Sequence, residues 1–156
     1  MALTLEEKKA VVAEVSEVAK GALSAVAAQY IGLTVEDLTN LRVKAREENV
    51  YLRVVKNTLA RRALEDTDFA CMSERLTGPL ILAFSQEDPG AAARVTKEFA
   101  KSHDKFQVTM LSVGGELLEP SDIDKLAKLP TREQAISTLM AVMLAPTEKF
   151  VRTLNE

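Results

Sequence analysis

The stretch GPLILAF, at residues 78–84, is the strongest strand signal in this sequence. A glycine and a proline introduce a short run of large apolar side chains, which is typical of a strand. Residues 50–55 (VYLRVV) and 106–113 (FQVTMLSV) alternate with the two-residue period of a strand. Residues 23–30 (LSAVAAQY) are ambiguous, because alanine favours a helix while a short apolar run between two glycines favours a buried strand. We interpret them as a strand.

Helical patterns separate these strands, and most of them begin with a capping residue. Thr4 and Glu7 form a capping box, and the stretch from Thr34 to Asp37 opens a second helix. Strands that alternate with helices predict an α/β (α+β) fold, a mixed sheet packed with helices, over residues 1–130. The expected helices are residues 4–21, residues 34–49, a segment with Asn57 as N-cap, a short turn around Cys71 to Leu76, a segment with Asp88 as cap and Pro89 in the first helical position, and residues 120–129.

The pattern changes at Pro130, and residues 131–156 are expected to form a separate, protruding C-terminal helical segment. Thr131 and Gln134 supply a new capping box, and Pro146 interrupts or kinks the helix. An apolar stripe of this kind either packs back onto its own domain or binds another chain, to whose surface methionine side chains adapt. The stripe consists of Ile136, Leu139, Met140, Met143, Phe150, Val151 and Leu154.

Charge is distributed unevenly along the chain. Residues 41–62 hold seven basic side chains and two acidic ones, a net charge of +5, while the whole chain carries −3. The other residues therefore sum to −8. Such asymmetry indicates a positive patch on an anionic body, although a set of solvated helix faces would give the same count.

The basic side chains of this segment come from a helix, a strand and the next helix in succession, so they can converge on one surface. Lys56 stands just before a helix whose free N–H groups at Asn57 and Thr58 suit a phosphate, and Tyr51 is available to stack. This arrangement positions phosphates and leaves little room for reading bases, which suits a folded RNA better than a DNA groove. The cations concerned are Arg42, Arg46, Arg53, Lys56, Arg61 and Arg62.

Groups that would carry catalysis form no constellation in this sequence. We interpret His103, the only histidine, as a surface residue and Cys71, the only cysteine, as a buried, inert thiol. No second histidine or cysteine is available to share a metal ion, so we expect no metal, no cofactor and no enzymatic activity. The start, MALTLEEKK, lacks the apolar run of a signal peptide, and no segment reaches the ~20 apolar residues of a membrane span. A reducing cytosol fits best.

Six segments, in order over nearly the whole chain, resemble the bacterial large-subunit ribosomal protein ten, a family of stalk-base proteins called P-zero in other kingdoms. VVKNTL and LPTRE together make the resemblance specific. The matching segments are GLTVEDLTNLR (32–42), ARE (45–47), VVKNTLARRA (54–63), GPLILAFSQEDPGAAAR (78–94), EFAKSHDKF (98–106) and LAKLPTREQAISTLM (126–140).

The resemblance implies a structural role in the ribosome, in the cytoplasm. Members of this family bind large-subunit ribosomal RNA at the base of the stalk, beside the neighbouring stalk-base protein eleven. Bacterial members also repress translation of their own operon by binding its messenger leader. By position, the RNA-contacting residues are Gly32, Leu33, Thr34, Arg42, Arg46, Lys56, Asn57, Thr58, Arg61 and Arg62; we add Arg53 from charge and strand phase alone.

The same resemblance implies that the C-terminal helix carries dimers of the acidic stalk protein, which recruit translation GTPases. By position, the resemblance implies that these dimers bind the apolar stripe from Ile136 to Leu154. Two departures stand out. The family commonly has a basic residue before GLTV, where this chain has Ile31, and its members usually extend beyond FVRTLNE, so we expect a shortened C-terminus here.

Two other hypotheses compete with an RNA-anchored stalk scaffold. One is a small α/β enzyme that uses the loop after LILAF, since ligands often sit at the carboxyl ends of strands; it rests on fold analogy alone. The other is a protein-only adaptor, in which the basic patch meets an acidic partner.

Overall fold

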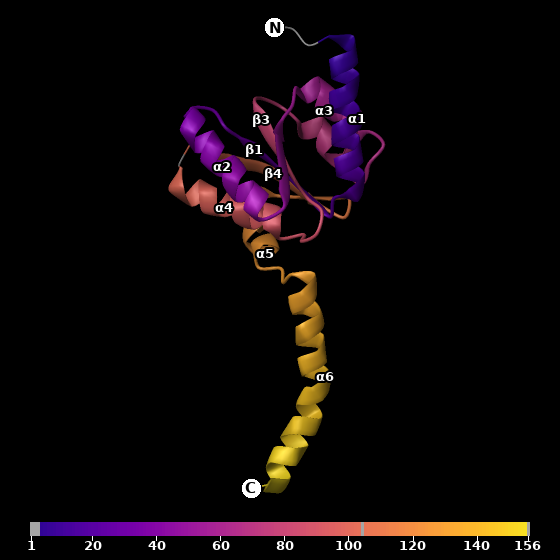
Figure 1. Cartoon of the computed structure of the whole chain (residues 1–156), viewed down its shortest axis with the longest axis vertical. Helices are drawn as coiled ribbons and strands as arrows, with labels where there is room; N and C mark the ends of the chain where they lie inside the picture. Colours follow the sequence, from indigo (N-terminus) through magenta and orange to yellow (C-terminus); the bar gives the residue numbers. More distant parts are fainter. Residues whose placement is uncertain (1–3, 104, 156) are drawn as a thin grey trace.

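The computed structural model describes residues 4–103 and 105–155, in which helices and strands alternate before one long final helix (Figure 1). All four strands expected from the sequence are present. A fifth, β5, was missed because three residues are too few to show an alternating pattern. The elements are α1 (Leu5–Gly21), β1 (Ser24–Gln29), α2 (Val35–Glu47), β2 (Val50–Val54), α3 (Asn57–Leu64), the 3-10 helix η1 (Asp68–Arg75), β3 (Leu80–Ser85), α4 (Ala91–Ser102), β4 (Gln107–Val113), β5 (Glu116–Leu118), the 3-10 turn η2 (Pro120–Asp122), α5 (Ile123–Ala127) and α6 (Arg132–Asn155).

The strands form one sheet in the order β2-β3-β1-β4-β5. α2 returns the chain from β1 to β2 so that these two strands run parallel, but β3 lies between them and pairs antiparallel with both. β3 and β4 stand in the same relation, with β1 between them. The expected helices packed on one sheet are confirmed. The sheet differs from the expected mixture of pairings, because this interleaving makes all of its described pairs antiparallel.

Helices cover both faces of the sheet, with α1, α3 and η1 on one face and α2, α4 and α5 on the other (Figure 1). The two central strands β1 and β3 supply alternate side chains to both layers, so nearly all their residues are buried. The first layer is built on Leu64, Phe69, Met72, Leu76, Phe84 and Met110, and the second on Leu41, Ile81, Phe99, Phe106 and Leu111.

The capping boxes that the sequence predicts at Thr4 and Thr34 are both present. At Thr131 the backbone N–H and the hydroxyl each bond Gln134 at 3.3 Å, which confirms the third one.

Two predicted helix starts are wrong. The N-cap of α3 is Lys56 rather than Asn57, because the Asn57 side-chain amide donates instead to the Gly78 carbonyl at 2.8 Å. α4 begins at Ala91, after Gly90, and Asp88 accepts the Gly90 N–H at 3.0 Å without entering the helix.

α6 is a continuous helix of 24 residues, about 36 Å long. Pro146 lies inside it without ending it, so of the two expected effects the interruption is wrong, while a kink at Pro146 stays a prediction. From residue 132 to residue 154 only the Ala145 side chain is half-buried and all others are exposed. Figure 1 shows α6 leading away from the sheet and its covering helices, which confirms the protruding C-terminal helix.

Candidate functional site

One end of the sheet gathers loops that are far apart in the sequence. Gln29, the last residue of β1, pairs with Leu80 and Gln107, which begin β3 and β4, and Val54 at the end of β2 pairs with Ile81. The segments beyond these residues therefore lie side by side, and about 14 Å separates the axes of β2 and β4 at ordinary strand spacing. We call this region, residues 30–34, 55–58, 77–79 and 105–106, the sheet end.

A hollow of about 500 Å³ opens at the sheet end, where α3 begins. Lys56 and Thr58 are exposed on its rim, and Lys56, the N-cap of α3, makes no side-chain capping bond among the described residues. The first N–H groups of α3 therefore remain available to an anion, which the helix dipole also favours. The lining residues are Tyr30, Val54, Val55, Lys56, Asn57, Thr58, Gly78, Pro79 and Leu80.

The predicted loop at Gly32 and Thr34 lies beside this hollow. Gly32 has a φ of +82°, a left-handed conformation that favours glycine. The Thr34 hydroxyl accepts the Asp37 N–H at 3.2 Å, so this side chain acts as the cap of α2. Leu33, half-buried, packs against the second layer of the core. The groups of this loop that are available to a binding partner are therefore mainly those of its backbone.

Lys105 is a cation of the sheet end that the sequence analysis missed. Its side chain lies over Gly32, where an added Cβ would be 3.1 Å from Lys105 Cδ and 3.8 Å from its Nζ. It precedes β4, and it reaches the loop after β1 because these strands are neighbours. No local pattern marks it, since it stands outside the basic segment 41–62 and only the pairing of β1 with β4 brings it here.

Arg53 and Tyr51 point to α1 instead of the sheet end. Arg53 forms an ion pair with Glu14 and donates to the Tyr51 hydroxyl at 2.9 Å, while that hydroxyl donates to Glu14 at 2.6 Å. The hydrogen bonds from Tyr51 and Arg53 lower the pKa of the Glu14 carboxyl, and burial raises the pKa of the Tyr51 phenol. Tyr51 is therefore held by its neighbours and does not stand free to stack on a base.

The two predicted arginine pairs lie on helices that cover opposite faces of the sheet, on either side of the edge strand β2. Arg42 and Arg46 on α2 are exposed and line a second hollow, of about 230 Å³, with residues of β2. On α3, Arg61 donates to the Ser73 carbonyl at 3.1 Å and to the Leu76 carbonyl at 2.9 Å, which ties the helix to η1. The Arg62 side chain is exposed. The sequence predicted that all these cations converge on one surface. In the structure, Lys56 lies at the sheet end, and the arginines of α2 and α3 lie on either side of it.

The apolar stripe of α6 forms a second candidate surface. At 100° per residue, its seven predicted residues lie within about 120° of the helix circumference. They are between 48% (Ile136) and 71% (Met143) exposed, far from the nearly complete burial of the core. A stripe so exposed has no packing role within the described chain.

The surroundings of His103 and Cys71 differ from those that the sequence predicts. His103 is half-buried, stacked on Phe99 at 4.2 Å, with Nε2 3.2 Å from Asp37 Oδ1, so it links α4 to α2 and is not a plain surface residue. Cys71 is half-buried, with its Sγ 3.5 Å from Ser112 Oγ. Within the described residues there is no group of acidic, histidine and cysteine side chains that could hold a metal ion, and no helix combines the length and apolarity needed to span a membrane.

The cationic sheet end and the exposed apolar stripe of α6 are two separate candidate binding surfaces, and the comparisons with known proteins show which family carries them. The family model described as "Ribosomal protein L10" matches residues 3–101, and the model "Ribosomal protein uL10 C-terminal region" matches residues 129–155. The large ribosomal subunit protein uL10 of Thioalkalivibrio sulfidiphilus is 67% identical over 156 residues, which cover 100% of this chain and 89% of that protein. The corresponding protein of Alcanivorax borkumensis is 61% identical over the same shares of both chains. That of Methylococcus capsulatus is 64% identical over 152 residues, 97% of this chain and 87% of its own length.

The chain therefore belongs to the uL10 family of structural proteins of the large ribosomal subunit. The resemblance noted in the sequence is confirmed. Because this family is structural, the hypothesis of a small α/β enzyme is wrong, and the expectation of a protein that is not an enzyme is confirmed.

Substitutions of Arg61 and Arg62 test which basic side chains of α3 stabilise the folded protein. We expect Arg61→Ala to lower the free energy of unfolding by about 1–2 kcal/mol, because two carbonyl groups lose a charged donor. Arg62→Ala, the matched control, should change it by less than about 0.5 kcal/mol. Urea unfolding followed by circular dichroism measures both. Equal effects of the two substitutions would contradict the assigned role of Arg61.

Proposed function

We propose that this protein binds large-subunit ribosomal RNA at the stalk base through the sheet end and carries acidic stalk protein dimers on α6. One observation supports this division most directly. β3 begins at the sheet end, while its last residue, Ser85, leads to Asp88 and Gly90, beside which the chain leaves for α6. The two surfaces are thus at opposite ends of the body, so one can be occupied without obstructing the other.

Phosphate contact is proposed for the sheet end on chemical grounds. Lys56 and the first N–H groups of α3 offer a charge and directed donors at one point. Lys105 adds a second cation over the exposed backbone of Gly32. Asn57 and Thr58 line the same hollow, and Leu33 and Thr34 shape the loop next to it. Arg42, Arg46 and Arg62 are proposed as flanking contacts, while Arg53 and Arg61 contribute mainly to the protein's own stability.

The finer partners follow from this proposal and from membership of the family. A protein with this RNA surface works bound to the large subunit in the cytoplasm, beside stalk-base protein eleven. The same surface would bind the messenger leader of its own operon, since both ligands present folded ribose-phosphate. For α6, the acidic stalk dimers would cover the stripe from Ile136 to Leu154, and methionine side chains there can adapt to a partner surface.

The RNA-binding part is tested with Lys56→Ala and Lys105→Ala, each measured against a stalk-base ribosomal RNA fragment over a range of salt concentrations. Each lost phosphate contact should weaken binding and reduce the slope of log affinity against log salt by roughly 0.7–0.9. Lys149→Ala, which removes the same charge from α6, is the control and should leave the slope unchanged. If neither sheet-end variant changes the slope while the control behaves as stated, the RNA lies elsewhere. Retention of the protein on ribosomes after nuclease digestion would instead favour a protein-only adaptor.

The α6 part is tested in the full chain by the double variant Leu139→Asp with Met143→Asp. Both side chains are exposed, so the melting temperature should stay within a degree or so of the original, while acidic stalk dimers no longer co-purify. Thr138→Asp places the same charge on the other side of α6 and should retain the dimers. Undiminished co-purification with the double variant would disprove the stripe as the docking surface.

A further inference from the structure

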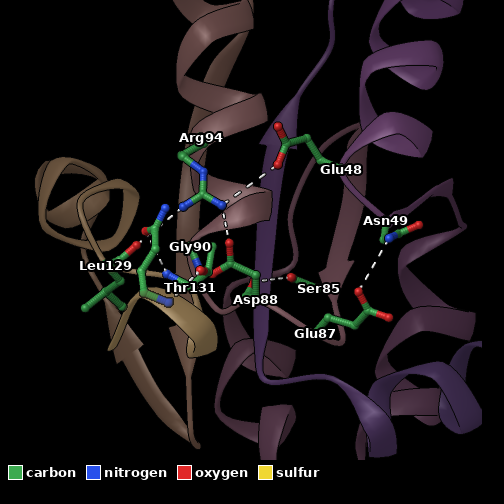
Figure 2. A network of polar contacts seen from close by, with 10 residues as sticks. Glu48, Asn49, Ser85, Glu87, Asp88, Gly90, Arg94, Leu129 and Thr131 are labelled. Atoms are coloured by element: carbon green, nitrogen blue, oxygen red, sulfur yellow. Dashed lines mark hydrogen bonds and ion pairs between the residues drawn. The ribbon is translucent and has the colours of Figure 1, made fainter. Parts of the chain in front are cut away.

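The junction between the globular body and α6 is held by Arg94 of α4. Its guanidinium Nη1 donates to the Leu129 carbonyl at 3.4 Å, and its Nη2 forms an ion pair with the Asp88 carboxylate (Figure 2). The same Nη2 lies 3.8 Å from Glu48 Oε2, at the end of α2. One planar side chain thus joins three segments, which a guanidinium fork does better than an ammonium group.

The partner of Arg94 is itself fixed. Asp88 is 15% exposed, its Oδ1 accepts the Gly90 N–H at 3.0 Å, and its carbonyl accepts the Ala91 N–H at 3.1 Å and the Ser85 hydroxyl. These bonds attach Asp88 to the end of β3 and to the start of α4 (Figure 2). The carboxylate that holds Arg94 is therefore part of the rigid body.

Gly90 lets the outgoing chain pack closely against this clamp. An added Cβ at Gly90 would be 3.0 Å from the Leu126 carbonyl and 3.3 Å from the Leu129 carbonyl, both backbone atoms. Gly90 has a φ of −88°, which other residues adopt readily, so close approach and not backbone conformation requires glycine here.

α6 begins almost at once after this contact. Pro130 has a restricted φ, and the capping box of Thr131 and Gln134 starts the helix directly after it. The α6 side chains from residue 132 to residue 154 are exposed apart from half-buried Ala145, so they contribute almost no packing against the body. The direction of α6 is therefore determined at the Leu129 carbonyl and its neighbours.

We propose that Arg94 is the positioning residue that fixes the direction of α6 relative to the sheet. It acts as a clamp between Asp88 in the body and Leu129 in the outgoing chain, and Gly90 provides the space that the clamp needs. This inference concerns the geometry of the chain by itself and does not depend on RNA or on stalk dimers. In the proposed function it has a consequence, because a fixed α6 holds its cargo at a defined place relative to the RNA-bound end.

The test measures the distance between spin labels by pulsed electron resonance in the full chain. The labels are attached at Asn40→Cys on α2 and Ala141→Cys on α6, and Cys71→Ala removes the native thiol. Both labelled positions are exposed, and residue 141 lies before Pro146. Residue 141 is ~13 Å along α6, so a swing of about 20° displaces it by about 5 Å. We expect a narrow distribution for the native sequence and a broad one for Arg94→Ala, with the sheet domain still folded by circular dichroism.

Two further variants make the outcome decisive. Lys44→Ala removes a cation that lines the same surface hollow as Arg94 and pairs with Glu98, away from the outgoing chain, so its distribution should match the native one. Gly90→Ala should shift the mean distance by several ångströms, because the new methyl group pushes on two carbonyl groups. A native distribution in folded Arg94→Ala would overturn the proposal, whatever Gly90→Ala does. If Arg94→Ala does not fold, Gly90→Ala decides by itself.

Discussion

The antiparallel pairing of β1 with β3 is the interaction on which both surfaces of this protein depend. Their residues are buried on both faces, so the pair forms the centre of two core layers at once. β3 separates β1 from β2, and β1 separates β3 from β4, although helices connect each of these pairs along the chain. This interleaving brings Lys56, Gly32 and Lys105 to one end of the sheet and sends Asp88 and Gly90 to the other. A fold with directly paired parallel strands would distribute these loops differently.

The charges of this chain divide between internal and external roles. Arg53, Arg61 and Arg94 each contact protein groups: a carboxylate of α1, two carbonyl groups near η1, and the junction with α6. Exposed ion pairs contribute little to stability, but a guanidinium that also donates hydrogen bonds to backbone carbonyl groups contributes more. Lys56 and Lys105 at the sheet end face outward on an acidic body, which restricts the attraction for a polyanion to a small region. Local arrangement rather than total charge therefore gives this anionic protein a cationic surface at one end of its sheet.

Local features of the fold could be predicted from the sequence, and long-range ones could not. The capping boxes at Thr4, Thr34 and Thr131, the four longer strands and the separate final helix follow from patterns within a few residues of one another. The start of α3 was misjudged because the Asn57 side chain bonds Gly78, 21 residues away. That partner is invisible without the pairing of β2 with β3. Whether the tail folds back or protrudes depends on whether the globular body offers a surface against which α6 can pack. An apolar stripe within α6 does not contain that information.

The candidate site shows the same limit. Membership of the family pointed to the Gly32 loop and to Lys56, and the topology places both at the sheet end. Charge alone also selected Arg53, but an acidic residue on α1 faces that strand, and only the tertiary structure shows it. Conversely, no local sequence pattern marks Lys105, and it belongs to the sheet end because β4 pairs with β1. Residue type indicated the chemistry, while the strand order determined which residues share a surface.

Amide hydrogen exchange of the full chain, with and without a stalk-base ribosomal RNA fragment, is the most direct measurement of the central claim. If the sheet end is the RNA surface and α6 is a separate one, the RNA should slow exchange in residues 30–34, 55–60 and 105–108 and leave residues 132–155 unchanged. Slower exchange along α6, or protection of the α1 face with the sheet end unaffected, would contradict the account.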